Sequence, residues 1–161
     1  MQHLAVNTAV HINPNDRDWE MTAAGRPFSY KYGYGRLDGY AYVQAARTWN
    51  LVKPQAWLAL PPIRVNGGMM MANGHTEGGK KLSRKGVESM VIVTPEAMRE
   101  RNLEKLEHIT VRVWITHDKR GDVEVELVSP NSVKSVLAAP RRLDEHDTGF
   151  SGWQFSTIKH W

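Results

Sequence analysis

The sequence predicts a mainly β protein, a β-sandwich or jelly roll that follows a short helical segment. Two observations carry this prediction. After residue 55, several short runs alternate apolar with polar residues, and turn-forming residues separate these runs at close spacing. Before residue 50, apolar residues recur at helical spacing instead. The 161 residues are enough to bury a core, and they suit one ordinary domain or two partial ones.

The first piece, residues 1–50, begins with a short apolar run and continues into an aromatic-rich loop. Residues 4–12 are read as the end of a helix that Asn13-Pro14 stops. Gly33 and Gly35 lie one residue apart beside aromatic side chains, which predicts a tight bend or a close backbone approach.

A second helix is expected after that bend. Asp38 stands where a helix N-cap belongs, because its carboxylate can accept hydrogen bonds from backbone N–H groups. Residues 42–49 then form an apolar stripe that Pro54 closes. Trp49 and Trp57 flank the junction of the two pieces, and we expect them to hold the pieces together.

The second piece is predicted to consist of strands. Residues 109–116 and 123–127 alternate apolar with polar side chains on either side of a polar stretch, which predicts an antiparallel hairpin. Residues 133–138 and 87–94 are two further candidate strands. The glycine-rich residues 66–85 show no periodicity and are read as a mobile surface loop.

A short helix is expected directly after residues 87–94. Thr94 is a favourable N-cap, and Pro95 suits the first helical position, where its missing N–H costs nothing.

The charge of the chain favours a solvated, slightly basic surface. The formal net charge is +4, and the positive residues are scattered apart from residues 80–85 and Arg141-Arg142. No aromatic residue accompanies the first cluster for base stacking, and no nucleic-acid-binding motif is present, so we expect no nucleic-acid partner. No stretch approaches the length of apolar residues that a membrane helix needs.

Candidate chemistry is sparse, and each candidate has a structural interpretation beside the functional one. His117 with Asp118 and Asp122 could form an acid–base or metal cluster, but Asp and Gly are typical of turns. Residues 144–147 offer oxygen ligands without the order of an EF-hand, so a solvated loop is favoured. The tyrosines of residues 30–42 are better suited to packing around the glycine bend than to sugar stacking.

No catalytic or metal-binding residue can be assigned from these patterns. The chain has no cysteine, which removes thiolate nucleophiles and cysteine metal ligands. Its serines lie outside the Gly-x-Ser-x-Gly context of an activated nucleophile, and no metal-ligand spacing of histidines occurs. Composition and spacing therefore lead only to a β-rich domain behind a helical segment.

The order of several short motifs indicates more than composition and spacing do. Residues 32–40, with the sequence YGYGRLDGY, resemble the closing motif of the catalytic domain in subtilisin-like serine proteases. The second piece resembles the P domain, or Homo B domain, which follows that catalytic domain in kexin- and furin-like proprotein convertases. The matching blocks are residues 106–111, 120–123, 126–130 and 149–155.

The resemblance implies a two-part organisation. Residues 1–50 would be the C-terminal segment of a subtilisin-like α/β catalytic domain, and residues 51–161 a C-terminally incomplete P domain with a jelly-roll fold. Only residues 67–85 look foreign to the family. The triad of the family precedes the closing motif, so we expect a fragment that has no proteolytic activity alone.

The parent protein, by the same resemblance, is a calcium-dependent serine endopeptidase of the late secretory pathway or its membranes. It would cut secretory precursors after paired basic residues, with its calcium ligands mainly in the catalytic domain. The partners of this segment would be its own catalytic domain, by packing, and the protein substrates of the parent. The alternative is a free-standing β-sandwich module that binds carbohydrate or protein without enzymatic activity.

The residues expected to serve structure or the domain interface come from these motifs and from the junction. The seven candidates are Tyr34, Asp38, Trp49, Trp57, Arg120, Asp122 and Trp153.

Overall fold

The computed structural model describes residues 1–73 and 75–160. The chain forms two compact units. Unit 1 comprises Met1–Gln55 and the stretch that begins at Lys159, and unit 2 comprises Ala56–Ile158. The assignment of residues 1–50 and 51–161 to two functional domains stays a prediction.

Unit 1 contains two short helices and one small sheet. β1 and β2 pair antiparallel, with Glu20 opposite Phe28. The apolar interior contains Leu4 and Phe28, while Ser29 and Lys159 are the polar side chains buried most completely. The elements are α1 (Gln2–Asn7), β1 (Glu20–Met21), β2 (Pro27–Phe28) and α2 (Gly39–Arg47).

The polar network of unit 1 explains how a serine and a lysine can be buried there. The Ser29 hydroxyl donates a hydrogen bond of 2.5 Å to the Asp18 carboxylate, and this bond lowers the pKa of Asp18. The Lys159 ammonium donates to Glu20 Oε2 at 2.6 Å and lies 5.0 Å from the centre of the Tyr30 ring. Buried polar groups need such partners, because an unpaired one loses its hydration without compensation.

The glycine bend is confirmed, and it shortens the first helix. The helix expected over residues 4–12 is α1, which ends at Asn7. Val10 instead forms an antiparallel bridge with Arg36, with N–O distances of 2.8 and 2.9 Å. Gly35 has a φ of +124°, and a Cβ there would overlap the Val10 carbonyl. Only glycine permits the backbone of residue 35 to lie this close to the Val10 carbonyl. The Val10–Arg36 bridge that results requires extended backbone at Val10, and the helix accordingly ends before this residue.

The predicted cap of the second helix is confirmed. Asp38 Oδ1 accepts a hydrogen bond from the Ala41 backbone N–H at 2.9 Å. The helix ends at Arg47 with Thr48 as C-cap, so the expected extension through Trp49 to Pro54 is wrong. The backbone N–H of Trp49 instead closes a turn onto the Ala46 carbonyl.

Asp38→Ala is expected to destabilise unit 1 by about 1 kcal/mol, because the first turn of α2 loses its side-chain acceptor. Asp38→Asn should cost only a few tenths of a kcal/mol, since Asn caps about as well as Asp. Urea unfolding followed by far-UV circular dichroism measures both variants. Equal losses in the two variants would show that the carboxylate acts through something other than capping.

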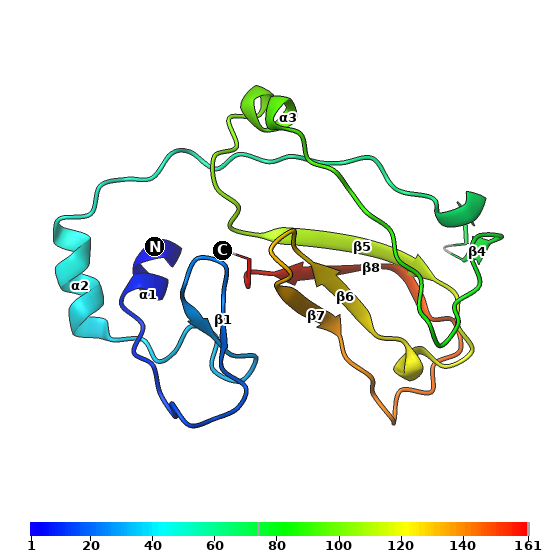
Figure 1. Ribbon diagram of the computed structural model, residues 1–161, viewed down its shortest axis with the longest axis horizontal. Helices are drawn as coiled ribbons and strands as arrows, with labels where there is room; N and C mark the ends of the chain where they lie inside the picture. The colour runs from blue at the N-terminus through cyan, green and yellow to red at the C-terminus, as the bar shows by residue number, and fades with distance from the viewer. Residues whose placement is uncertain (74, 161) are drawn as a thin grey trace. The chain divides into compact units, whose positions relative to one another are not determined.

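Unit 2 is built mainly of strands, with one short α-helix. Its elements are η1 (Val65–Gly67), β3 (Met69–Met70), β4 (Thr76–Glu77), α3 (Pro95–Glu100), β5 (Ile109–Ile115), η2 (Arg120–Asp122), β6 (Val125–Val128), β7 (Lys134–Ala138) and β8 (Phe150–Thr157). β3–β4, β5–β8 and β6–β7 each form an antiparallel pair. The β5–β8 and β6–β7 pairs run beside one another (Figure 1), and the Ser135 hydroxyl on β7 meets that of Thr157 on β8 at 3.0 Å.

The hairpin expected between residues 109–116 and 123–127 is wrong. β5 pairs with β8, which lies much later in the chain, and a bulge follows Val113. β6 pairs with β7 through a turn that begins at Ser129, where the Ser132 N–H donates to the Ser129 carbonyl at 2.9 Å. The strand predicted over residues 133–138 is confirmed as β7.

The core of unit 2 lies between these strand pairs. Its buried residues are Val123, Ala138 and Phe150, and Phe150 is only 1% exposed. Partly buried apolar side chains pack around them, among them Leu82, Val113, Ile115, Val125 and Phe155.

Two further expectations in unit 2 need correction, and one is confirmed. Residues 87–94 were expected to form a strand, but they form none. Met90 and Ile92 are 77% and 73% exposed. The run of apolar residues is therefore not paired with another strand. Residues 66–85 contain β3, β4 and the end of η1, so they are not wholly irregular. The predicted helix start is confirmed, because the Thr94 hydroxyl accepts from the Ala97 N–H at 3.2 Å.

The expectation of a mainly β protein with little helix is confirmed, whereas the full jelly-roll order stays a prediction. Within the described residues, no helix has the length and apolar character to cross a membrane.

Candidate functional site: an arginine–carboxylate cluster

A polar site in unit 2 is centred on the Asp144 carboxylate, which accepts four hydrogen bonds from two arginines. Arg120 Nε and Nη2 donate to its two oxygens, each at 2.8 Å. Arg141 Nε and Nη2 donate to Oδ2 at 3.1 and 3.0 Å. One carboxylate thus binds two guanidinium groups, and the fork of Arg120 is bidentate, the geometry that makes such pairs strong and directional.

These hydrogen bonds change the acidity of Asp144. The bonds from Arg120, and secondly those from Arg141, lower the pKa of the Asp144 carboxyl from its ordinary 3.8 to about 2. The same pairing raises the pKa of Arg120. Asp144 is therefore a carboxylate at every physiological pH and has no role as a proton donor.

Backbone hydrogen bonds also join the two segments that carry the cluster. η2 binds the segment after β7 through three backbone hydrogen bonds of 2.8–2.9 Å, from Arg120 to His146, from Gly121 to Asp144 and from Arg141 to Gly121. Gly121 is buried, and a Cβ there would overlap the carbonyl oxygen of Arg141. The two loops meet at a distance that only glycine allows.

Aromatic rings connect the cluster to the core. The Arg120 guanidinium lies 4.7 Å from the centre of the Trp153 ring, and that of Arg141 lies 5.7 Å from the Phe150 ring. Trp153 and Phe150 meet edge to face at 5.4 Å. The cluster therefore fastens two loops over β8 by ion pairs, cation–π contacts and packing.

The pH dependence of stability should reveal this cluster. The lowered pKa of Asp144 means that its contribution is fully present above about pH 4 and is lost as the pH falls toward 2. Asp144→Asn should therefore lower Tm by several degrees at pH 7, and the difference from wild type should shrink between pH 4 and pH 2. Thermal unfolding across that range measures it.

The matched control is Asp147→Asn, on the same loop, where the side chain is exposed. Its Tm should follow that of wild type at every pH. A Tm difference for Asp144→Asn that is constant down to pH 2 would contradict the assigned ion pairs.

The sequence did not point to Asp144 or Arg141 as partners of Arg120. Residues 144–147 were interpreted as a solvated loop and Arg141-Arg142 as a basic cluster, whereas Asp144 is largely buried and joins arginines 3 and 24 residues away. No local pattern encodes a contact over that separation.

The His117 candidate does not form an acid–base cluster. His117 Nδ1 lies 2.7 Å from the carbonyl oxygen of Lys119 and 3.0 Å from its N–H, and Asp118 and Asp122 are exposed. Within residues 1–73 and 75–160, no group of three or more His, Cys, Asp or Glu side chains is placed to hold a metal ion.

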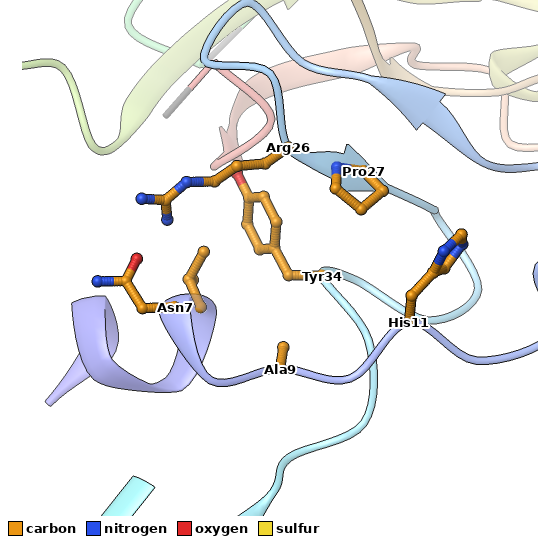
Figure 2. A pocket seen from close by; sticks show the side chains of 7 residues that line it. Asn7, Ala9, His11, Arg26, Pro27 and Tyr34 are labelled. Atoms are coloured by element: carbon orange, nitrogen blue, oxygen red, sulfur yellow. The ribbon is translucent and has the colours of Figure 1, made fainter. Parts of the chain in front are cut away.

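Unit 1 contains an open cavity of about 340 Å³ beside the glycine bend. Figure 2 shows Tyr34 crossing its middle, with Asn7 and Arg26 toward one end and His11 toward the other. Partial burial raises the pKa of the Tyr34 hydroxyl, so this group stays protonated. The cavity is lined by both polar and apolar side chains, and none of its lining residues is a nucleophile with an adjacent base.

The structure places the seven interface candidates at different sites. In unit 1, Tyr34 lines the cavity, Asp38 caps α2, and the Trp49 ring lies 6.2 Å from that of His3. In unit 2, Arg120 and Trp153 belong to the cluster, Asp122 is exposed in η2, and Trp57 is 66% exposed. Their role at a domain interface stays a prediction.

Sequence relatives cover the whole chain. Protease KEX1 of Kluyveromyces lactis is 39% identical over 161 residues, which are 100% of this chain and 20% of that protein. The dibasic-processing endoprotease of Schizosaccharomyces pombe is 36% identical over 166 residues, 100% of this chain and 22% of that protein. Kexin of Saccharomyces cerevisiae is 31% identical over 162 residues, 100% of this chain and 19% of that protein. The chain spans about a fifth of the length of these curated relatives.

Structural and family comparisons agree with these relatives. A crystal structure of a serine protease of Aeromonas sobria matches with a TM-score of 0.71 over 99% of this chain and 30% of that chain. At 19% identity this likeness concerns the fold alone. The family model of the proprotein convertase P-domain matches residues 106–161, which include β5, η2, β6, β7 and β8. The whole chain is thus similar in sequence to kexin-like proprotein convertases, and residues 106–161 match the proprotein convertase P-domain.

Proposed function

We propose that this chain is a structural part of a kexin-like serine endoprotease that cuts secretory precursors after paired basic residues. The observation that carries the proposal is similarity along the entire chain to proteases that include a dibasic-processing endoprotease. The P-domain match over residues 106–161 falls on a non-catalytic part. A free-standing binding module is not favoured, because the likeness also covers residues 1–105.

The structure supports a stabilising role in physical terms. In the arginine–carboxylate cluster of unit 2, the Asp144 carboxylate accepts hydrogen bonds from Arg120 and Arg141. The two guanidinium groups also lie against aromatic rings of β8. Such a cluster fixes loop positions and offers no free nucleophile or base. The proposed partner is the catalytic domain of the same protease, which this segment would keep folded.

Dependence on calcium and a location in the secretory pathway are proposed only from the similarity to kexin-like proteases. The described residues do not fit a calcium site, since no carboxylate cluster of the required size occurs among them. No step of the proposal therefore depends on a metal ion held by this chain.

A chimera tests the proposal. The 161 residues of Protease KEX1 that align with this chain are replaced by this chain, and a deletion variant of Protease KEX1 lacks them. We expect the chimera to accumulate and cleave a fluorogenic Lys-Arg peptide, and the deletion variant to yield no active enzyme. Activity of the purified 161-residue chain alone, blocked by a serine-directed inhibitor, would overturn the structural assignment, and so would full activity of the deletion variant.

A further inference from the structure

Three of the seven methionines of the chain are consecutive, at residues 69–71. They form β3 and the residue after it, and β3 pairs with β4 in a two-stranded ribbon that lies at the label β4 in Figure 1. We call it the methionine ribbon. Methionine carries a neutral, polarisable thioether, a group that binds soft metal ions. The register of the ribbon decides which of the three sulfur atoms share a face.

This register places two of the three methionines on one face. Met69 lies opposite Glu77. The Met71 N–H donates to the His75 carbonyl at 2.8 Å, which continues the same register toward the turn. In an antiparallel pair, opposite residues share a face, and successive residues of one strand alternate between faces. One face of the ribbon, which we call the sulfur face, therefore carries two thioethers, one imidazole and one carboxylate.

The opposite face of the ribbon carries Met70 and Thr76, which are paired with each other. The Thr76 hydroxyl lies 2.7 Å from the hydroxyl of Thr116, the residue directly after β5. This hydrogen bond joins the Met70 face to the end of β5. The third methionine is thus separated from the other two by the backbone of the ribbon.

The two thioethers and the imidazole of the sulfur face lie within reach of one metal ion. Met71 and His75 are directly opposite each other, a position in which Cβ atoms lie about 4.5–5.5 Å apart. Met69 and Met71 are two residues apart on one strand, a separation of about 7 Å. Each methionine side chain has three rotatable bonds, so both sulfur atoms can approach the imidazole.

The ribbon is held at its base and at its turn. At the base, a Cβ added to Gly68 or to Gly79 would lie 3.2 Å from the Cα of the other glycine. At the turn, Asn73 Oδ1 accepts a hydrogen bond from the His75 N–H at 3.0 Å. The His75 imidazole makes no hydrogen bond, ion pair or ring contact within the part of the chain that the structure describes. This ring is exposed, and Met69 is 51% exposed, so an ion can reach both from solvent.

The types of ligand decide which metal ion fits the sulfur face. Thioether sulfur selects Cu(I), and imidazole also suits copper. Ca²⁺ and Mg²⁺ need several oxygen ligands, and Zn²⁺ is bound by sets of Cys, His and carboxylate ligands. The sulfur face has only one imidazole and one carboxylate, which is too few for either set. The chain has no cysteine, so no thiolate competes for a soft ion.

We propose that the sulfur face is a Cu(I)-binding site whose ligands are Met69, Met71 and His75. The imidazole binds in its neutral form, and binding breaks no covalent bond and transfers no electron. A carboxylate prefers harder cations, so Glu77 is not one of the ligands. The site lies outside residues 106–161, which match the P domain, and its binding of copper does not depend on the proposed function.

A titration followed by nuclear magnetic resonance tests the site. The purified chain, labelled with ¹³C at its methionine methyl groups, receives Cu(I) under nitrogen with ascorbate as reductant. Of the seven methyl signals, those of Met69 and Met71 should shift together and saturate at one Cu(I) per chain. The signal of Met70 should stay in place, and so should that of Met90, which is 77% exposed. Single Met→Leu variants assign the signals.

Substitutions on the two faces of the ribbon refine the test. Met69→Leu, Met71→Leu and His75→Gln should each weaken Cu(I) binding by at least about tenfold, because even the outer partners of metal ligands typically change affinity by 10–100-fold. Met70→Leu is the matched control, with the same change on the opposite face, and should bind Cu(I) as wild type does. Far-UV circular dichroism confirms that each variant is folded.

Three results would overturn the proposal. The first is that no methyl signal shifts at a several-fold excess of Cu(I). The second is that the Met70 or Met90 signal shifts along with those of Met69 and Met71, which would mean that any exposed thioether binds the ion. The third is that Met70→Leu weakens binding as much as Met71→Leu, which would contradict the register of the ribbon.

Discussion

Replacing Gly149 with alanine is expected to destabilise unit 2 by roughly 2–5 kcal/mol. Gly149 is buried directly before β8, and its φ is +67°, in the left-handed region. A Cβ at this position would overlap the Ile115 carbonyl oxygen and lie 2.8 Å from the His117 nitrogen. Both contacts are with backbone at the end of β5, so no side-chain rotation can relieve them.

Gly86→Ala is the matched control. Gly86 has nearly the same φ, +73°, but an added Cβ there meets nothing within 4 Å. Its cost should therefore be the conformational strain alone, about 1–2 kcal/mol. Urea unfolding with a shared m value measures both free energies of unfolding. Equal losses in the two variants would show that β5 and β8 do not approach one another as closely as the structure has them.

Phe150→Ala is expected to cost about 3–5 kcal/mol, as large-to-small substitutions of buried aromatic residues do. Phe150 is 1% exposed and meets the Trp153 and Phe155 rings edge to face, at centroid distances of 5.4 and 5.5 Å. Its removal also takes away the ring beneath the Arg141 guanidinium. The variant should lose core packing and loosen the arginine–carboxylate cluster together.

Leu143→Ala controls for the loss of an apolar side chain. Leu143 is 97% exposed, so its truncation should change the free energy of unfolding by less than about 0.5 kcal/mol. Chemical denaturation followed by tryptophan fluorescence compares the two variants. A loss below about 1 kcal/mol for Phe150→Ala would mean that the core of unit 2 lies elsewhere.

The features predicted successfully from sequence are local ones. Asp38 and Thr94 were identified as caps because the N-cap, its acceptor atom and the N–H groups it serves lie within three residues. The β7 strand and the turn before it follow from residues adjacent in sequence. The resemblance to the P domain likewise rests on short blocks in a fixed order.

The features that sequence reasoning missed depend on distant pairing. Alternation showed that Val111, Val113 and Ile115 share a face of β5, but it does not specify the partner strand, so β8 was overlooked in favour of the nearer β6. The Arg120–Asp144 pair joins residues 24 positions apart. No local pattern distinguishes Gly149 from the other glycines, because its constraint comes from the Ile115 carbonyl.

The most direct test of the structural role is active-site titration of the Protease KEX1 chimera. Gly149→Ala in the chimera should lower the amount of active enzyme recovered, while kcat per titrated active site on a Lys-Arg peptide stays equal to that of Gly86→Ala and of the unmodified chimera. A normal yield of enzyme with a reduced kcat per active site would contradict the account, because it would place this chain in the chemistry rather than in the support of the fold.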